Sequence, residues 1–410
     1  MTDLKDSGVY WLGEVASDFD IVPSTIIFRE RSEKNLKDDI HLTPSQKYGV
    51  LPQDKYQEIT GGKVMQKLSD SDMKHVEPND FVIHLRSFQG GIERSQIRGK
   101  VSTAYTVLEP RDGVFTGYWR YFLKSAPFIE GMASSTDQLR DGQTINYARF
   151  SRLKLLRPPL ETQRRIADYL DKEISEMDTL IEEFDGLATN LTNRRSLLIT
   201  KKLYDHLNGC ERSVVGLWNY ASTNPLTPEF RDLPEGEKID FLPLENVWSH
   251  GKADYSEKIA WDGGKSSYTQ FRRGDILVPK VTPTVFHGRT MVAETESPIG
   301  LATSEVHTLR AHLNADPRWI VYNMLSSKFL DEARGQIYGV AGLQRISTQY
   351  LSTFKVPLTP LEKQVEIADE LDREFERMDT LIEESTRLIE NLKARKTALI
   401  TEVVTGRKEV

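Results

Sequence analysis

The sequence predicts an α+β protein in which two mixed α/β blocks are separated by two long helices that pair as an antiparallel coiled coil. The first observation is an internal repeat: residues 159–200 and 360–401 align without a gap at an offset of 201, with 24 identities over 42 positions. The second is that both copies carry apolar residues at heptad spacing and lack proline beyond their first position. Because 410 residues is about twice the offset, each half is a variable block followed by a repeated helix. We place the first block at 1–157, the first helix at 158–208, the second block at 209–357 and the second helix at 358–410.

The apolar residues of both helices follow alternating steps of three and four, which defines a seam for helix pairing. About 45 residues at ~1.5 Å per residue predict helices of ~68 Å, the second ending at Gly406. A further stripe, Leu180 and Leu187 with Leu381 and Leu388, is expected to contact a globular neighbour. Packing of each helix on its own block alone, or pairing between chains, are the alternatives. The predicted seam residues are Leu170, Ile174, Met177, Ile181, Phe184, Leu191 and Leu198, and Leu371, Phe375, Met378, Ile382, Ile389, Leu392 and Leu399.

Composition is that of a globular protein, with 38% hydrophobic and 28% charged residues. We find no apolar run near the ~18 residues that span a bilayer, and no signal peptide at the N-terminus. The lone cysteine, Cys210, excludes an internal disulfide and a cysteine-based zinc site. A cytoplasmic protein is expected.

Negative charge is concentrated in the repeats. Residues 158–185 carry nine acids and three bases, and residues 359–386 carry ten acids and three bases, so the two segments together have a net charge of −13. The whole chain has a net charge of −7, so the remainder carries about +6. This segregation allows the helices and the blocks to have different partners.

Both blocks contain short β-rich runs between turn residues, and they share two landmarks. Residues 79–82 match 274–277, and 143–146 match 344–347. Polar and basic residues follow the first landmark in both blocks. Arginine and glutamine suit contacts with base edges, while lysine and threonine suit phosphates. The candidate DNA-binding residues are Arg86, Gln89, Arg94, Arg98, Lys100, Gln143, Lys280, Thr282, Thr284, His287, Arg289, Gln344 and Arg345.

Motifs for catalysis are missing from the sequence. There is no Gly-x-Gly-x-x-Gly and no His-Glu-x-x-His, and Gly264-Lys265-Ser266 lacks the earlier glycine of a phosphate-binding loop. We therefore predict no catalytic, cofactor-binding or metal-binding residue, and a binding protein rather than an enzyme. An enzyme with an unrecognised active site, such as a nuclease or DNA methyltransferase, and a coiled-coil scaffold that does not bind DNA remain the alternatives.

The entry into each helix reads Pro-Leu-x-x-Gln-x-x-Ile-Ala-x-x-Leu-Asp, at 159–171 and again at 360–372. With this duplication the chain resembles the specificity subunit of Type I restriction–modification systems over nearly its whole length. The resemblance implies two target-recognition domains that read a bipartite double-stranded DNA sequence, with the helices setting the unread spacer. It also implies recruitment of two modification (methyltransferase) subunits and of restriction (endonuclease and translocase) subunits. S-adenosylmethionine, ATP and magnesium would be bound by those partners, and the specificity subunit itself would be non-catalytic.

Overall fold

The computed structural model describes residues 3–61, 73–84, 90–134, 146–205, 213–247, 253–265, 267–281, 284–336 and 344–410. By their internal contacts the residues form two units, and each helix of the repeat contributes to both. Unit 1 comprises 1–184 and 387–410, and unit 2 comprises 185–386. Each unit is therefore one globular block together with part of each long helix.

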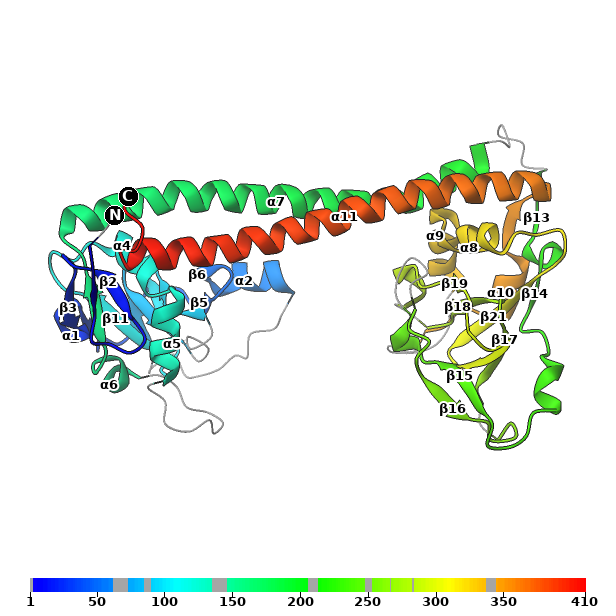
Figure 1. Ribbon diagram of the computed structural model, residues 1–410, viewed down its shortest axis with the longest axis horizontal. Helices are drawn as coiled ribbons and strands as arrows, with labels where there is room; N and C mark the ends of the chain where they lie inside the picture. The colour runs from blue at the N-terminus through cyan, green and yellow to red at the C-terminus, as the bar shows by residue number, and fades with distance from the viewer. Residues whose placement is uncertain are drawn as a thin grey trace. The chain divides into compact units, whose positions relative to one another are not determined.

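Unit 1 is built around a four-stranded antiparallel sheet of order β4-β11-β8-β9, with four two-stranded pairs beside it, β1-β2, β3-β12, β5-β6 and β7-β10. Figure 1 shows these strands below the start of α7. The elements are β1 (Leu4–Asp6), β2 (Glu14–Ala16), β3 (Asp20–Pro23), α1 (Ser24–Ile27), β4 (Phe28–Glu30), β5 (Leu42–Ser45), β6 (Gly49–Pro52), α2 (Gln53–Thr60), β7 (Lys74–Val76), β8 (Phe81–Ile83), β9 (Glu93–Arg94), β10 (Gly99–Val101), β11 (Thr106–Pro110), α4 (Thr116–Phe122), α5 (Ala126–Ser134), α6 (Tyr147–Phe150), β12 (Lys154–Arg157) and the start of α7 (Leu160–Tyr204).

Unit 2 contains the corresponding sheet, β14-β21-β18-β19, and a second four-stranded sheet of order β16-β15-β20-β17 in which β15 and β20 are parallel. The elements are β13 (Val214–Gly216), η4 (Leu217–Asn219), β14 (Ala221–Thr223), η5 (Pro228–Arg231), β15 (Lys238–Leu242), η6 (Leu244–Asn246), β16 (Lys258–Ala260), β17 (Thr269–Arg272), β18 (Ile276–Pro279), η8 (Thr284–His287), β19 (Met291–Val292), β20 (Ile299–Ala302), β21 (Val306–Ala311), α8 (Pro317–Leu325), α9 (Ser327–Gln336), α10 (Thr348–Thr353), β22 (Lys355–Pro357) and the start of α11 (Leu361–Val404).

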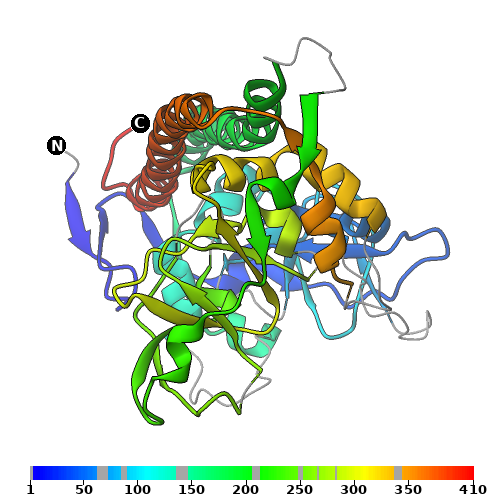
Figure 2. The same ribbon diagram turned by 90° about the vertical axis from the view of Figure 1, so that its right-hand side faces the viewer.

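The two long helices are present and they pair, which confirms the predicted fold class. They have 45 and 44 residues, and Gly406 follows the second with a positive φ of 71°, as a helix-terminating glycine does. Figures 1 and 2 show the green end of α7 beside the orange start of α11 in unit 2. The described part of the chain contains no helix that is both long and apolar enough to traverse a bilayer.

Ion pairs between the helices fix their direction in each unit. In unit 1, Lys396 Nζ lies 2.6 and 2.7 Å from the carboxylate oxygens of Asp178. In unit 2, Arg195 donates to Asp379, and Lys202 Nζ donates to Glu370 at 2.7 Å. In unit 2 the residue numbers of the partners in α11 fall as those in α7 rise, so the pairing is antiparallel. The hydrogen bond from Lys408 Nζ to the Tyr169 hydroxyl, at 2.9 Å, gives the same direction in unit 1.

The predicted seam is covered to different degrees along the helices. Seven of its residues are buried and seven are half-buried. The buried ones lie where the helices enter the two main cores. They are Leu170, Ile174, Met177, Leu371, Phe375, Met378 and Leu399. The half-buried ones are Ile181, Phe184, Leu191, Leu198, Ile382, Ile389 and Leu392.

The second stripe was wrongly expected to contact a globular neighbour. Leu180, Leu187, Leu381 and Leu388 are 40–45% exposed. The last turns of the helices make that contact instead, through Ile199 and Leu203 in unit 2 and through Val403 and Val404 in unit 1. The reason is that each block packs against the ends of the helices, and these leucines lie nearer their middles.

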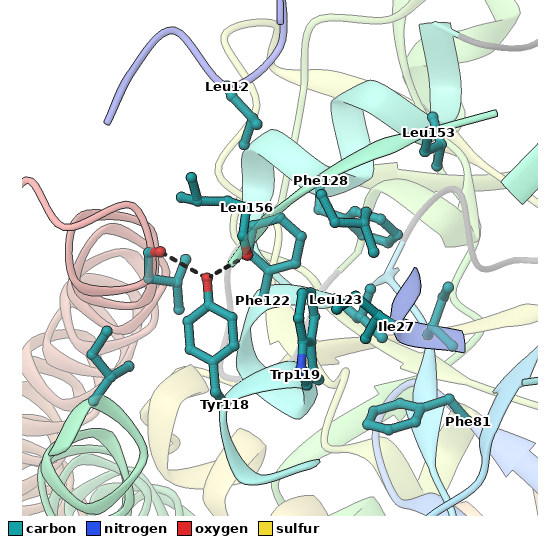
Figure 3. Close-up of a cluster of buried hydrophobic side chains, with 14 of the residues drawn as sticks. Leu12, Ile27, Phe81, Tyr118, Trp119, Phe122, Leu123, Phe128, Leu153 and Leu156 are labelled. Atoms are coloured by element: carbon teal, nitrogen blue, oxygen red, sulfur yellow. Dashed lines mark hydrogen bonds between the residues drawn. The ribbon is translucent and has the colours of Figure 1, made fainter. Parts of the chain in front are cut away.

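Tyr118 joins helix α4 to the end of α11 inside unit 1. Its side chain is fully buried, and its hydroxyl donates to one of two carbonyl oxygens that lie within hydrogen-bond distance, at 3.2 Å in Leu156 and 3.0 Å in Val404. Figure 3 shows the hydroxyl between these two carbonyls, with Phe122 and Trp119 packed beside the ring. The contact ties the first block to the last turn of the chain's second helix.

Replacing Tyr118 by phenylalanine should therefore lower the free energy of unfolding by about 1–2 kcal/mol, because a buried hydrogen-bond partner is removed and the ring is kept. Urea unfolding followed by far-UV circular dichroism measures the change. Tyr10→Phe is the matched control, since Tyr10 is 89% exposed. Equal stabilities for the two variants would contradict the assignment.

Candidate nucleic-acid interface

The first landmark forms the same turn in both blocks. Asn79 and Gly274 have positive φ values of 77° and 87°, and each precedes the aspartate that enters the central strand. Asp80 Oδ2 accepts the Glu77 amide at 2.8 Å, and Asp275 Oδ2 accepts the corresponding amide three residues before it, also at 2.8 Å. The alignment at an offset of 195 is thus a structural equivalence, and it places the residues after β8 and β18 at equivalent points of the two sheets.

In unit 2 the structure brings both landmarks together. Val281 forms a β-bridge with Arg345, and the Ile346 amide donates to the carbonyl of Lys280 at 3.0 Å. The side chain of Lys280 is held in the same region, because its Nζ donates to the Ser304 carbonyl at 2.6 Å. Two candidate regions about 65 residues apart in sequence therefore form one surface.

Glu305 is the acidic member of this surface, and the sequence analysis missed it. Arg345 binds both of its carboxylate oxygens, at 2.7 and 2.6 Å. Burial lowers the pKa of Lys280, opposed by the charge of Glu305. The hydrogen bond and charge of Arg345 lower the pKa of Glu305. Because Arg345 is already held by a carboxylate, a base contact from it would require exchange of that ion pair. No sequence signal connects Glu305 to Arg345, since they are 40 residues apart.

The other described candidates of unit 2 lie on and after η8. Thr284 and Arg289 are half-buried and His287 is exposed. Arg289 Nη1 donates to the Leu244 carbonyl at 3.4 Å. Gln344 is half-buried beside Arg345. Thr282 lies outside the described residues.

The candidates of unit 1 do not share one environment. Arg94 is half-buried at the end of β9 and donates to the Thr116 hydroxyl at 3.4 Å. Burial, together with the charge of Arg120, lowers its pKa. Lys100 is buried, at 7% exposure, within strand β10. Arg86, Gln89 and Gln143 lie outside the described residues.

Arg98 is exposed and belongs to a charged cluster around a buried histidine. Its Nε donates to Asp39 Oδ1 at 3.1 Å. The other oxygen of Asp39 lies 2.7 Å from Nδ1 of His75, and Glu77 lies 2.7 Å from Nε2 of the same ring. Burial lowers the pKa of His75, but the hydrogen bonds and charges of the two carboxylates outweigh it, so the net pKa is above its usual range. The cluster holds the exposed Arg98 side chain through Asp39.

A different histidine, His307, is kept neutral. Burial lowers its pKa to about 4. Its ring lies 3.2 Å from the Ile346 carbonyl and 3.1 Å from the Asn224 side chain. His307 supports the Lys280–Arg345 surface by its hydrogen bond to Ile346, the residue after Arg345, and not by charge. Across the parts of the chain that the structure describes, no three His, Cys, Asp or Glu residues are grouped as metal ligands.

Comparison with solved structures shows which class this fold defines. A chain from a type I restriction–modification assembly has a TM-score of 0.70 at 13% identity and covers 95% of this chain and 98% of its own length. The HsdS subunit from Thermoanaerobacter tengcongensis has a TM-score of 0.56 at 14% identity and covers 98% and 100%. The chain therefore has the fold of HsdS subunits, with two blocks and two long helices.

Sequence comparison agrees with the fold. The EcoAI specificity subunit of Escherichia coli is 25% identical over 145 residues, which are 35% of this chain and 25% of the relative. The EcoEI specificity subunit of the same organism is 23% identical over 165 residues, 39% of this chain and 27% of the relative. The match spans about a quarter of the length of these relatives, and no protein-family model matches the chain. The resemblance to specificity subunits of Type I restriction enzymes, expected from the repeated motif, is confirmed.

The His75 cluster gives a pH-dependent stability. Because its folded pKa is raised, its contribution is complete below the unfolded value of about 6.5 and is lost as pH rises through the folded value. The loss of stability caused by His75→Gln should therefore be larger at pH 6 than at pH 9, measured by urea unfolding at both values. His287→Gln, at an exposed site, is the control. A destabilisation that is the same at both pH values would count against charged pairing in the cluster.

Proposed function

We propose that this chain is the DNA sequence-specificity subunit of a Type I restriction–modification complex. The observation that carries the proposal is the HsdS fold over 95–98% of the chain, joined to the repeated helix-entry motif. In this proposal residues 1–157 and 209–357 are target-recognition domains, and each reads one half of a bipartite double-stranded DNA target. The long helices, 158–208 and 358–410, set the unread spacer. The chain is non-catalytic and acts in the cytoplasm.

DNA contacts in this proposal come from the two blocks. The Lys280–Arg345 surface and the exposed His287 supply donors in unit 2, and Arg94 with Arg98 supply them in unit 1. Guanidinium and imidazole groups suit base edges, while lysine neutralises phosphate. The acidic helices are unsuited to phosphate contact, because 158–185 and 359–386 together carry −13.

The partners in this proposal are two modification subunits, followed by restriction subunits. Support comes from the exposed leucines at matching places of the two repeats, Leu180 with Leu381 and Leu187 with Leu388. Exposed apolar side chains on an otherwise charged helix surface are typical of a protein contact, and a surface that occurs twice fits two copies of one partner. S-adenosylmethionine, ATP and magnesium belong to those subunits and supply methyl transfer and translocation there.

The target should be bipartite with a fixed spacer. Sequencing the methylated adenines of a host that expresses the complete system should give a split, asymmetric motif. Inserting one base pair between its halves should abolish methylation, because the second block then faces the wrong base pairs, displaced by ~3.4 Å along the helix axis. Methylation of either half alone, by the same complex, would sink the proposal.

Removing positive side chains should weaken DNA binding in proportion to the number of phosphate contacts that are lost. Replacing Arg86, Arg94, Lys280 and Arg289 by glutamine together should reduce the slope of log affinity against log salt for the complete complex. Fluorescence anisotropy with a target duplex at several salt concentrations measures the slope. Lys172→Gln, at an exposed position of α7 and outside the two blocks, is the control substitution. An unchanged slope would favour a scaffold that does not touch DNA.

A further inference from the structure

Glu305 and Arg345 form a partly exposed ion pair on the Lys280–Arg345 surface of unit 2. Arg345 donates from Nε to Oε2 of Glu305 at 2.7 Å and from Nη2 to Oε1 at 2.6 Å, so one edge of the guanidinium binds both carboxylate oxygens. The two side chains are 34% and 32% exposed. A ligand from outside the chain therefore has access to both charged groups.

Three backbone segments hold this pair in place. The Lys280 amide donates to the Glu305 carbonyl at 2.8 Å, and the Ile346 amide donates to the Lys280 carbonyl at 3.0 Å. The ring of His307 lies 3.2 Å from the Ile346 carbonyl. The end of β18, the residue before β21 and the segment before α10 thus meet at the pair. Because their backbones are bonded to one another, the positions from which the two side chains project are fixed.

The ion pair is not part of the architecture that the two blocks share. Strands β11 and β21 correspond at an offset of 201, since each pairs in the same register with the strand that follows the shared turn. At this offset the first block has Ala104 and Thr144 in place of Glu305 and Arg345. A partly exposed ion pair also contributes little to stability, because solvent screens it. The pair therefore belongs to what distinguishes the second block and not to what folds it.

The hydrogen-bonding groups of the pair match one kind of base pair. The N–H groups of Arg345 that bind Glu305 are two donors side by side, and the carboxylate beside them is an acceptor. In the major groove a G·C pair presents two acceptors, guanine N7 and O6, and then one donor, the N4 amino group of cytosine. An A·T pair presents an acceptor, a donor and an acceptor. Only the G·C pair satisfies all three groups in this order.

The ion pair also penalises every other ligand. Both of its hydrogen bonds must break before Arg345 or Glu305 contacts a base through these groups, and only a ligand that replaces both partners offsets that loss. A phosphate would accept from Arg345, but it would leave Glu305 without a donor and next to a like charge. The arrangement therefore selects against contact with the DNA backbone as well as against A·T.

We propose that Glu305 and Arg345 are specificity-determining residues of the second block and that they exchange their ion pair for a G·C base pair. Arg345 donates to guanine O6 and N7, and Glu305 accepts from the N4 amino group of cytosine. The inference rests on the proposed function, because it requires that the block bind double-stranded DNA. It adds which base pair is read and which two side chains read it.

The first test changes single atoms of the DNA and leaves the protein unchanged. The probe is a duplex that carries the methylated target of the complete complex, with its guanines replaced one at a time by 7-deazaguanine, which lacks the N7 acceptor. At one guanine of one half-site the replacement should weaken binding about tenfold in fluorescence anisotropy, and the loss should disappear in the Arg345→Thr complex. Inosine at the same guanine removes only the minor-groove amino group and should leave the affinity unchanged.

The second test replaces the acidic member of the pair. Glu305→Ala introduces the residue that the first block has at this position, and it removes both the acceptor for cytosine and the restraint on Arg345. The preference for G·C over A·T at the same position should fall about tenfold, with the other half-site unaffected. Glu229→Ala is the matched control, because Glu229 pairs with Arg272 at 2.7 Å with similar exposure, but before the start of β18 and not at its end.

The outcomes separate this inference from the proposed function. If the wild-type complex binds a bipartite target and no 7-deazaguanine replacement weakens binding, or if Arg345→Thr weakens binding to all duplexes equally, the assignment of the pair is wrong and the proposed function stands. A Glu305→Ala complex with an unchanged preference for G·C also overturns the assignment. If the wild-type complex does not discriminate between duplexes at all, both proposals are wrong.

Discussion

Antiparallel pairing of the two repeated helices is the constraint on which both units depend. Leu399, Val403 and Val404 of α11 are buried in the core of unit 1, and Ile199 and Leu203 of α7 are buried in the core of unit 2. Each core is thus completed by the end of the helix that begins in the other half of the sequence. At about 1.5–3 kcal/mol for each fully buried aliphatic side chain, these residues represent several kcal/mol that neither block obtains from its own stretch of chain.

The duplication is preserved where side chains hold a block to its helix. Asp171 and Asp372 each accept the hydroxyl of a tyrosine, Tyr121 and Tyr322, at the same offset of 201. Gln163 and Gln364 each donate to the carbonyl five residues earlier, at 2.8 and 2.7 Å, which explains the glutamine of the helix-entry motif. The two blocks differ in the residues that lie between these contacts and the strands after the shared turn. Unit 2 adds a second four-stranded sheet there. The repeated contacts orient the blocks, and the variable surface is free to differ in what it recognises.

Features set by local periodicity could be predicted from the sequence, whereas features set by distant contacts could not. The seam, the helix lengths and the stop at Gly406 follow from spacing and from glycine's access to positive φ. Apolar spacing gives the face of a helix but not the part of it that a block covers, so the exposure of Leu180 and Leu388 was missed. The same limit applies to the candidate site. Lys100 looks like any loop lysine in sequence, and only its pairing in β10 buries it.

The residues that follow α11 lie against residues 12–16 of the first block. Arg407 donates to the Glu14 and Leu12 carbonyls at 2.9 and 2.8 Å, and a side chain at Gly406 would approach the Ala16 Cβ to 2.4 Å. Unit 2 is one continuous stretch, 185–386, while unit 1 is made of 1–184 and 387–410. During translation the second block therefore has all of its residues before the first block does. The first block, although synthesised earlier, acquires its final contacts last, and until residues 399–404 are present it exposes the apolar surface that Leu399, Val403 and Val404 later cover.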